Sequence, residues 1–79
     1  MWTVYILKCS DTTLYAGITN DLNRRLEEHN SGHGGRFTRV RKPVKLVYFE
    51  KVQTRSDALK REASIKRLSR SKKLELISA

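Results

Sequence analysis

The chain has 79 residues, of which 38% are hydrophobic and 32% are charged, and its formal net charge is +9 at pH 7. This length predicts one domain, residues 1–79, and the composition excludes an intrinsically disordered chain. The single cysteine excludes an internal disulfide, no apolar run approaches the roughly 20 residues of a membrane span, and no signal-peptide pattern follows Met1. We therefore expect a cytoplasmic protein with no membrane partner. The positive charge attracts polyanions, so nucleic acid is the expected partner.

The first predicted elements are two strands joined by a short turn. Residues 2–8 (WTVYILK) and 13–18 (TLYAGI) both alternate in apolar character, and residues 10–13 (SDTT) between them carry turn-forming side chains. This pattern is typical of a hairpin. If the more apolar residues of both strands face the core, Tyr5 and Tyr15 share the other face of the sheet.

A helix is predicted after the hairpin. Asn20 or Asp21 can cap its start, and Gly32 lies just past its end, where a left-handed residue is favoured. Leu22 and Leu26, one turn apart, form the stripe that this helix is expected to bury.

Helical spacing separates two neighbouring arginines. At 100° per residue, Arg25 and His29 lie beside the leucine stripe, whereas Arg24 and Glu28 lie on the far side. Arg24 should therefore be solvated, and Arg25 and His29 should border the core. The ordinary interpretation is a snorkelling arginine and a histidine near the helix C-terminus, where positive charge is favoured.

Residues 30–43 contain three glycines and several basic residues, and we expect a mobile loop in which Phe37 is the only large apolar anchor, although residues 36–40 could extend locally. Such a loop can track a phosphate backbone without reading its sequence. The predicted phosphate contacts in this loop are Arg36, Arg39, Arg41 and Lys42.

The apolar run at residues 44–52 predicts a third strand, central and largely covered. Thr54 and Asp57 form a capping box that opens a second helix near residues 56–69.

A last short helix is expected to start at Ser71, with Leu74 and Ile77 facing inward. The order β-β-α-β-α-α predicts a compact α+β domain, a three-stranded antiparallel sheet with flanking helices.

Glu62 does not fit a purely structural pattern. It shares one stripe of the second helix with Ala58 and Ile65, and an ionised carboxylate within an apolar face needs a partner. One interpretation is a salt bridge to Arg61, to Lys66 or to a neighbouring strand. The other is a carboxylate that holds a hard cation such as Mg²⁺, which prefers oxygen ligands and keeps several waters.

Two phenols, a guanidinium, an imidazole and one carboxylate together suit phosphodiester hydrolysis. The two tyrosines can also be ordinary strand residues that cover the sheet, but Gly17 in the second strand favours a close approach of another group. A phenol whose pKa is lowered by a nearby cation can act as the base for water, while a cation stabilises the phosphate. No zinc spacing, phosphate-binding glycine loop or nucleophile triad is present in the sequence.

The chain resembles the GIY-YIG nuclease superfamily over nearly its whole length. TVY at residues 3–5 and YAG at residues 15–17 stand where the superfamily has its two name-giving elements, and Arg25, His29 and Glu62 follow at matching positions. The stretches GITND, RRL, HN and IKRLSR look most like those of the small single-domain bacterial (YhbQ-like) members.

This resemblance implies a metal-dependent endonuclease that hydrolyses phosphodiester bonds in DNA, single-stranded and branched DNA included, with DNA repair as its setting. Tyr5 or Tyr15 would be the general base acting on water, with no covalent intermediate. Arg25 would stabilise the phosphate beside His29, and Glu62 would hold one Mg²⁺ or Mn²⁺ ion.

Two alternatives remain open at this point. One is a non-catalytic nucleic-acid-binding module that uses the basic loop and the second helix, including Lys66. The other is a nuclease domain whose target recognition comes from a protein partner. The sequence does not predict an oligomeric state.

Overall fold

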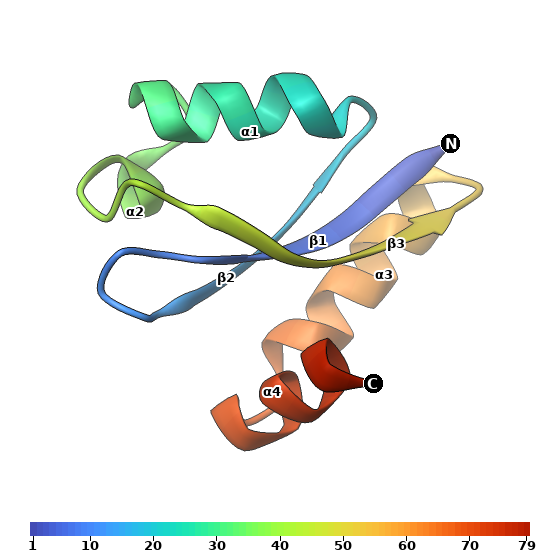
Figure 1. The fold of residues 1–79 in the computed structure, drawn as a ribbon. Coiled ribbons are helices and arrows are strands. Elements are labelled where there is room, and N and C mark those ends of the chain that lie inside the picture. Colours follow the sequence, from blue (N-terminus) through green and yellow to red (C-terminus); the bar gives the residue numbers. More distant parts are fainter.

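The structure is a computed structural model that describes residues 1–79, and it consists of a three-stranded antiparallel sheet with helices on both faces (Figure 1). The elements in chain order are β1 (Trp2–Lys8), β2 (Leu14–Thr19), α1 (Leu22–Ser31), α2 (Arg36–Arg39), β3 (Lys45–Val52), α3 (Arg55–Lys66) and α4 (Arg70–Ser78). The α+β prediction is confirmed, with one additional helix, so the order is β-β-α-α-β-α-α. None of the helices is both long and apolar enough to cross a membrane.

The register of the β1–β2 hairpin decides which side chains share a face. Val4 lies opposite Ile18 and Tyr5 lies opposite Gly17. Because side chains alternate along a strand, Val4 and Ile18 point into one core, whereas Tyr5 and Tyr15 lie on the other face of the sheet. The predicted common face of the two tyrosines is therefore confirmed.

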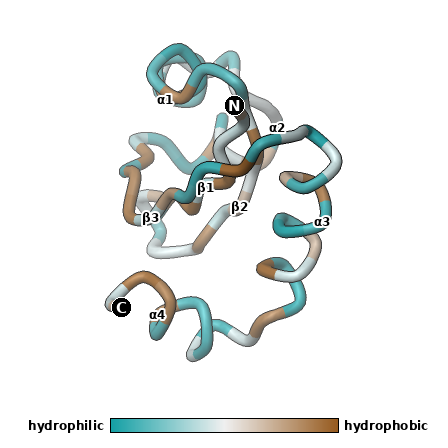
Figure 2. Tube along the Cα trace, turned by 90° about the vertical axis from the view of Figure 1, so that its right-hand side faces the viewer, coloured by the Kyte–Doolittle hydropathy of each residue, from teal (hydrophilic) through white to brown (hydrophobic).

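The sheet separates two apolar layers. One layer lies under α3 and α4, and its buried members are Val4, Ile6, Ala16, Ala58 and Ile65. The other lies under α1, where Leu22 and Leu26 pack against Tyr5 and Leu7 as the leucine stripe predicts. Figure 2 shows brown stretches in the strands and in α4 and a mainly teal α1, so the hydrophobic residues of this face come from both the sheet and α4.

The central strand is β1, not β3. The sheet order is β2-β1-β3, so the prediction of a central third strand was wrong. All five residues 3–7 of β1 are buried, whereas β3 exposes Lys45, Phe49 and Lys51. An apolar run marks a strand but does not say which strands flank it, because an edge strand can also pack one apolar face.

The caps of the last two helices explain where they begin. The Thr54 hydroxyl accepts a hydrogen bond from the backbone N–H of Asp57 at 3.0 Å, as the capping box predicts. This helix ends at Lys66, three residues before the predicted end, because Ser69 caps the next helix. The expected start of that helix at Ser71 was therefore slightly late.

The inward face of α4 differs from the expected one. Leu76 and Ile77 pack against the core under the sheet, whereas Leu74 is 43% exposed. The prediction for Ile77 is confirmed and that for Leu74 was wrong.

Residues 30–43 contain regular secondary structure within the segment that was predicted to be a loop. They contain α2, a short helix that lies beside the end of α1 (Figure 1). The Asn30 side chain accepts a hydrogen bond from the N–H of Val44 at 2.7 Å, and the N–H of Ser10 donates to the carbonyl of Arg41 at 2.9 Å. The prediction of a loop was wrong for residues 36–39, which form a turn of helix that packs Thr38 against His29.

Candidate active site

The hydroxyl of Tyr5 and the imidazole of His29 form a buried pair. The Tyr5 hydroxyl lies 3.1 Å from Nε2 of His29, and the two residues are only 1% and 0% exposed. Gly17 makes room for the phenol, since a Cβ atom at Gly17 would lie 2.6 Å from the Tyr5 hydroxyl. The glycine in the second strand therefore marks a close approach of a tyrosine, as its position suggested.

Caps at both ends of α1 determine where His29 lies. The Asp21 side chain accepts a hydrogen bond from the N–H of Arg24, and Gly32 adopts the left-handed conformation that ends the helix. Both caps were predicted. With Leu22 and Leu26 turned to the sheet, the helical spacing brings His29 onto the same buried side.

Tyr15 approaches the same imidazole from β2. Its ring centroid lies 5.5 Å from that of His29 in an edge-on arrangement and 5.6 Å from that of Phe37 in a stacked one. The side chain is half-buried, and its hydroxyl makes no hydrogen bond within the chain. Of the two phenols in the cluster, Tyr15 has the one that solvent can reach.

Thr38 holds the other side of the imidazole. Its hydroxyl lies 2.7 Å from Nδ1 of His29, and the residue is 1% exposed. Burial, and then the nearby charge of Arg25, lower the pKa of His29 below its ordinary value. The ring is therefore neutral at pH 7, with one nitrogen as donor and the other as acceptor, and each hydroxyl complements one of them.

Arg25 is oriented by backbone and carboxylate oxygens. Its Nη2 donates to the carbonyl of Gly34 at 2.8 Å, and its Nη1 lies 3.1 Å from Oε1 of Glu28. The Glu28 side chain, 39% exposed, thus reaches Arg25 along the helix, while Arg24 is exposed as expected. A Cβ atom at Gly34 would lie 2.3 Å from Nδ1 of His29, so only glycine fits this turn.

Burial makes the Tyr5 phenol harder to ionise than an ordinary tyrosine. Burial raises the pKa of Tyr5, Arg25 opposes the rise, and Tyr15 and Glu62 add to it. The expectation that a nearby cation would lower the pKa of a catalytic phenol was therefore wrong for Tyr5. The contribution of Glu62 indicates that this carboxylate belongs to the same electrostatic environment.

Glu62 lies in α3 on the stripe that carries the buried residues Ala58 and Ile65, and its side chain is 19% exposed. Its carboxylate pairs with Nζ of Lys66 at 3.5 Å, so the salt bridge that the sequence allowed is present. No group of three or more His, Cys, Asp or Glu side chains surrounds it. A lone carboxylate suits an ion that keeps several waters and completes its shell with substrate phosphate, not a cage built by the protein alone.

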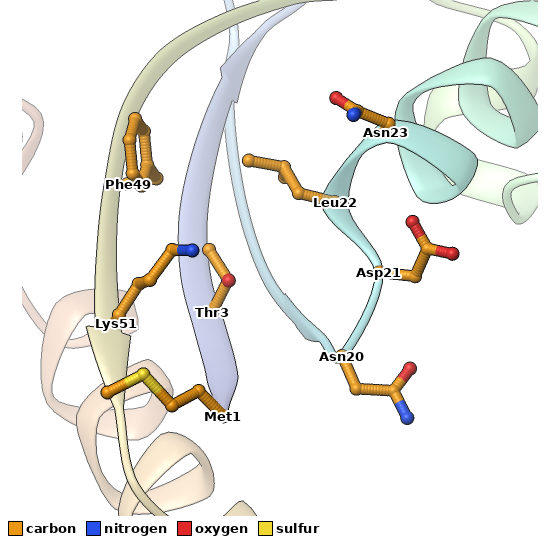
Figure 3. Close-up of a pocket in the computed structure, with 8 residues that line it drawn as sticks. All are labelled: Met1, Thr3, Asn20, Asp21, Leu22, Asn23, Phe49 and Lys51. Atoms are coloured by element: carbon orange, nitrogen blue, oxygen red, sulfur yellow. The ribbon is translucent and has the colours of Figure 1, made fainter.

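The four clustered residues do not line an exposed hollow. Tyr5, Tyr15, Arg25 and His29 lie together, but two of them are fully buried. Tyr5 and His29 are enclosed by the protein, whereas Tyr15 and Arg25 are partly exposed to solvent. The cavity of the molecule, about 370 Å³, lies elsewhere, between the start of α1 and the strands β1 and β3 (Figure 3).

The predicted phosphate contacts fall into two groups. Arg36, Arg39 and Lys42 are exposed. Arg41 instead donates to Asp11 Oδ2 and to the Phe37 carbonyl, both at 3.0 Å, and its guanidinium lies 4.1 Å from the Phe37 ring centroid. Lys66 is engaged by a carboxylate as described above.

Three residues next to the cluster were not predicted as site residues from the sequence: Gly34, Phe37 and Thr38. The glycine pair at residues 34–35 was interpreted as part of a loop. Glycine also occurs where the backbone approaches a side chain closely, and this signal could have indicated Gly34. Nothing in the sequence indicates Thr38, because its contact with His29 depends on how α2 turns back onto α1.

Residues 1–75 match the family model described as the GIY-YIG catalytic domain. UPF0213 proteins of Staphylococcus aureus strains Mu50 and N315 are 57% identical over 74 residues, covering 94% of this chain and 90% of theirs. The solution NMR structure of the UPF0213 protein BH0048 from Bacillus halodurans is 42% identical with a TM-score of 0.63, and the match covers 99% of this chain and 84% of that one. That of the protein EF2693 from E. faecalis is 44% identical with a TM-score of 0.65, covering 96% and 81%.

Proposed function

This chain belongs to the GIY-YIG catalytic domain family and to the UPF0213 family of small bacterial proteins, and from this premise we propose that it is a divalent-metal-dependent endonuclease that hydrolyses DNA. A GIY-YIG catalytic domain suggests a nuclease. The observation that carries the proposal is the buried Tyr5–His29 pair, with Tyr15 and Arg25 beside it. Such a pair of buried polar side chains costs stability unless it is satisfied, and a fold of this size does not need it.

We assign the water-facing role to Tyr15. Its hydroxyl has no partner within the chain, whereas the Tyr5 hydroxyl is buried and bonded to His29. In its phenolate form, Tyr15 takes a proton from a water that attacks phosphorus. The P–O bond to the leaving nucleotide breaks, and the departing oxygen takes a proton from solvent. The neutral imidazole of His29 contacts both phenol rings and orients Tyr5 next to Tyr15.

Arg25 supplies the positive charge for the phosphate. Its guanidinium is 32% exposed and is held by Gly34 and Glu28, so it is positioned before any substrate arrives. A preorganised cation is most effective against the negative charge that spreads over phosphate oxygens in the transition state. Arg25 also stands next to Tyr5, where it limits the rise of the phenol pKa.

Glu62 is the residue that would hold a single Mg²⁺ or Mn²⁺ ion. When bound, such an ion supplies positive charge to a phosphate oxygen. The half-buried carboxylate with one long contact to Lys66 fits this role, because a ligand oxygen remains available.

The competing function is a nucleic-acid-binding module without cleavage. The salt bridge between Glu62 and Lys66 and the raised pKa of Tyr5 both favour it. A related possibility is a nuclease whose target is chosen by a protein partner. Both would use the exposed basic residues in and just after α2, Arg36, Arg39 and Lys42, to hold the phosphate backbone.

A cleavage assay on single-stranded, duplex and branched DNA, with Mg²⁺ and with EDTA, tests the proposal. Glu62→Gln should abolish Mg²⁺-dependent cleavage while DNA binding survives, because most phosphate contacts lie elsewhere. Glu75→Gln is the matched control, since Glu75 forms a similar short-range ion pair with Lys72 on an exposed helix. If the parent protein binds DNA but cuts none of these substrates with Mg²⁺ or Mn²⁺, the binding-module function holds instead.

A further inference from the structure

The cavity between the start of α1 and the sheet has the form of a small binding site. Its volume of about 370 Å³ lies in the range of roughly 300–1,000 Å³ that is typical of pockets for small molecules. Figure 3 shows Phe49 and Lys51 on β3, Thr3 on β1 and Leu22 on α1 around one opening. None of these residues belongs to the Tyr5–His29 cluster.

Phe49 gives the cavity an uncovered aromatic face. Phe49 lies opposite Tyr5 in the β1–β3 pair, and both side chains stand on the α1 side of the sheet. Tyr5 leans the other way, over Gly17, and so does not cover Phe49. The ring is left 50% exposed on an edge strand.

The polar groups at the opening suit a nucleotide. The Lys51 ammonium and the Thr3 hydroxyl lie on the strand side, and the Asn23 amide extends from α1 toward the strands (Figure 3). The side chains of Asn20 and Asp21 point away from the strands, so the Asp21 carboxylate does not face a ligand there. An amide can hydrogen-bond a base edge, an ammonium can contact a phosphate, and an aromatic ring can stack on any base.

We propose that this cavity binds one unpaired nucleobase, stacked on Phe49, with Lys51 on an adjacent phosphate. A second copy of the chain is a poor occupant, because each copy carries a net charge of +9 and like charges oppose association. A polyanionic strand with planar bases complements both the charge and the aromatic face.

The proposal rests on the proposed function, since it gives the bound strand a second contact. Leu22 at the cavity and His29 in the cluster are seven residues apart on α1, which is roughly 10 Å along the helix axis. A strand that follows α1 can therefore occupy the cavity with a base close to the phosphate at Arg25.

The test uses a short single-stranded DNA that carries 2-aminopurine, a base whose fluorescence is quenched by stacking, in EDTA so that nothing is cut. Phe49→Ala should weaken binding by about 10-fold or more and abolish the quenching, because base–aromatic stacking contributes this much. Phe49→Tyr keeps the ring and should bind as the parent does. Leu74→Ala, at a comparably exposed apolar residue on α4, should change nothing.

An oligonucleotide of the same length with an abasic site in place of the reporter base separates the base from the backbone. The parent and Phe49→Ala should bind it equally. If Phe49→Ala weakens the intact and abasic strands alike, or if sedimentation shows a dimer that Phe49→Ala dissociates, the cavity does not hold a base. Cleavage with Mg²⁺ is measured in parallel: quenching without cleavage overturns only the proposed function, and cleavage without any Phe49 effect overturns only the cavity proposal.

Discussion

The Tyr5 hydroxyl lies 3.1 Å from Nε2 of His29, although 24 residues separate the two in the chain. Thr38 contacts the opposite nitrogen at 2.7 Å, so the imidazole is held from both sides by hydroxyl groups. All three residues are buried. Removing any one of them leaves a polar atom without a partner inside the protein, which links the stability of the fold directly to the proposed site.

Stability should fall as pH drops below about 6.5, the ordinary pKa of histidine. Burial and Arg25 lower the pKa of His29 in the folded state, so below pH 6.5 the unfolded chain binds more protons than the folded one. Urea unfolding at about pH 7.5 and about pH 5.5, on either side of that pKa, measures the effect. His29→Gln should show a smaller loss between these values, whereas His33→Gln, at an exposed histidine, should behave as the parent does.

Thr38→Val should destabilise the protein by about 1–3 kcal/mol, the cost of leaving a buried polar atom without its hydrogen bond. The variant keeps the shape of the side chain and removes only the hydroxyl that contacts His29. Thr38→Ser keeps the hydroxyl and is the matched control. Urea unfolding of both variants at neutral pH decides the matter, and equal losses would mean that packing and not the hydrogen bond is responsible.

Removing the hydroxyl of Tyr5 or of Tyr15 should affect stability and cleavage differently. Tyr15→Phe removes a hydroxyl that has no partner in the chain, so it should abolish cleavage with little change in melting temperature. Tyr5→Phe leaves Nε2 of His29 unpaired and should lower both. If Tyr15→Phe cuts DNA at the parent rate, the water-facing assignment is wrong and Tyr5 takes that role.

Arg25→Ala should lower the cleavage rate by about 10²–10³, as expected for the loss of one preorganised transition-state stabiliser. Arg24→Ala is its control, because Arg24 is adjacent in sequence but solvent-exposed. Rates are compared at saturating DNA, where differences in affinity do not contribute. Equal rates for the two alanine variants would remove Arg25 from the mechanism.

The exposed basic residues in and just after α2 should control the salt dependence of DNA binding. Alanine at Arg36, Arg39 and Lys42 together should reduce the slope of log affinity against log salt by about 0.7–0.9 for each phosphate that the protein no longer neutralises. Arg41→Ala should instead lower the melting temperature, since Arg41 is engaged by Asp11 and Phe37. An unchanged slope in the triple variant would indicate that another surface, such as that of α3 and α4, holds the backbone.

Local geometry was accessible from the sequence and tertiary arrangement was not. The caps at Asp21 and Gly32 and the leucine stripe follow from residues within one helix, and they were sufficient to predict that His29 borders the core. The position of β1 at the centre of the sheet depends on its pairing with β3, a strand far along the chain, and no local pattern records it. The contact of Thr38 with His29 likewise depends on α2. This helix has only four residues, so its sequence shows no helical pattern of hydrophobic residues.

The pairing of β1 with β3, from Trp2 opposite Val52 to Lys8 opposite Lys45, bears on how the protein is synthesised. A growing chain contains Tyr5, His29 and Thr38 before it contains any residue of β3. Until residues 45–52 have left the ribosome, one edge of the central strand has no partner, and such an edge is both unstable and prone to join other strands. A chain that stops at Lys42, before β3, should thus be digested readily by protease and should be unable to cut nucleic acid.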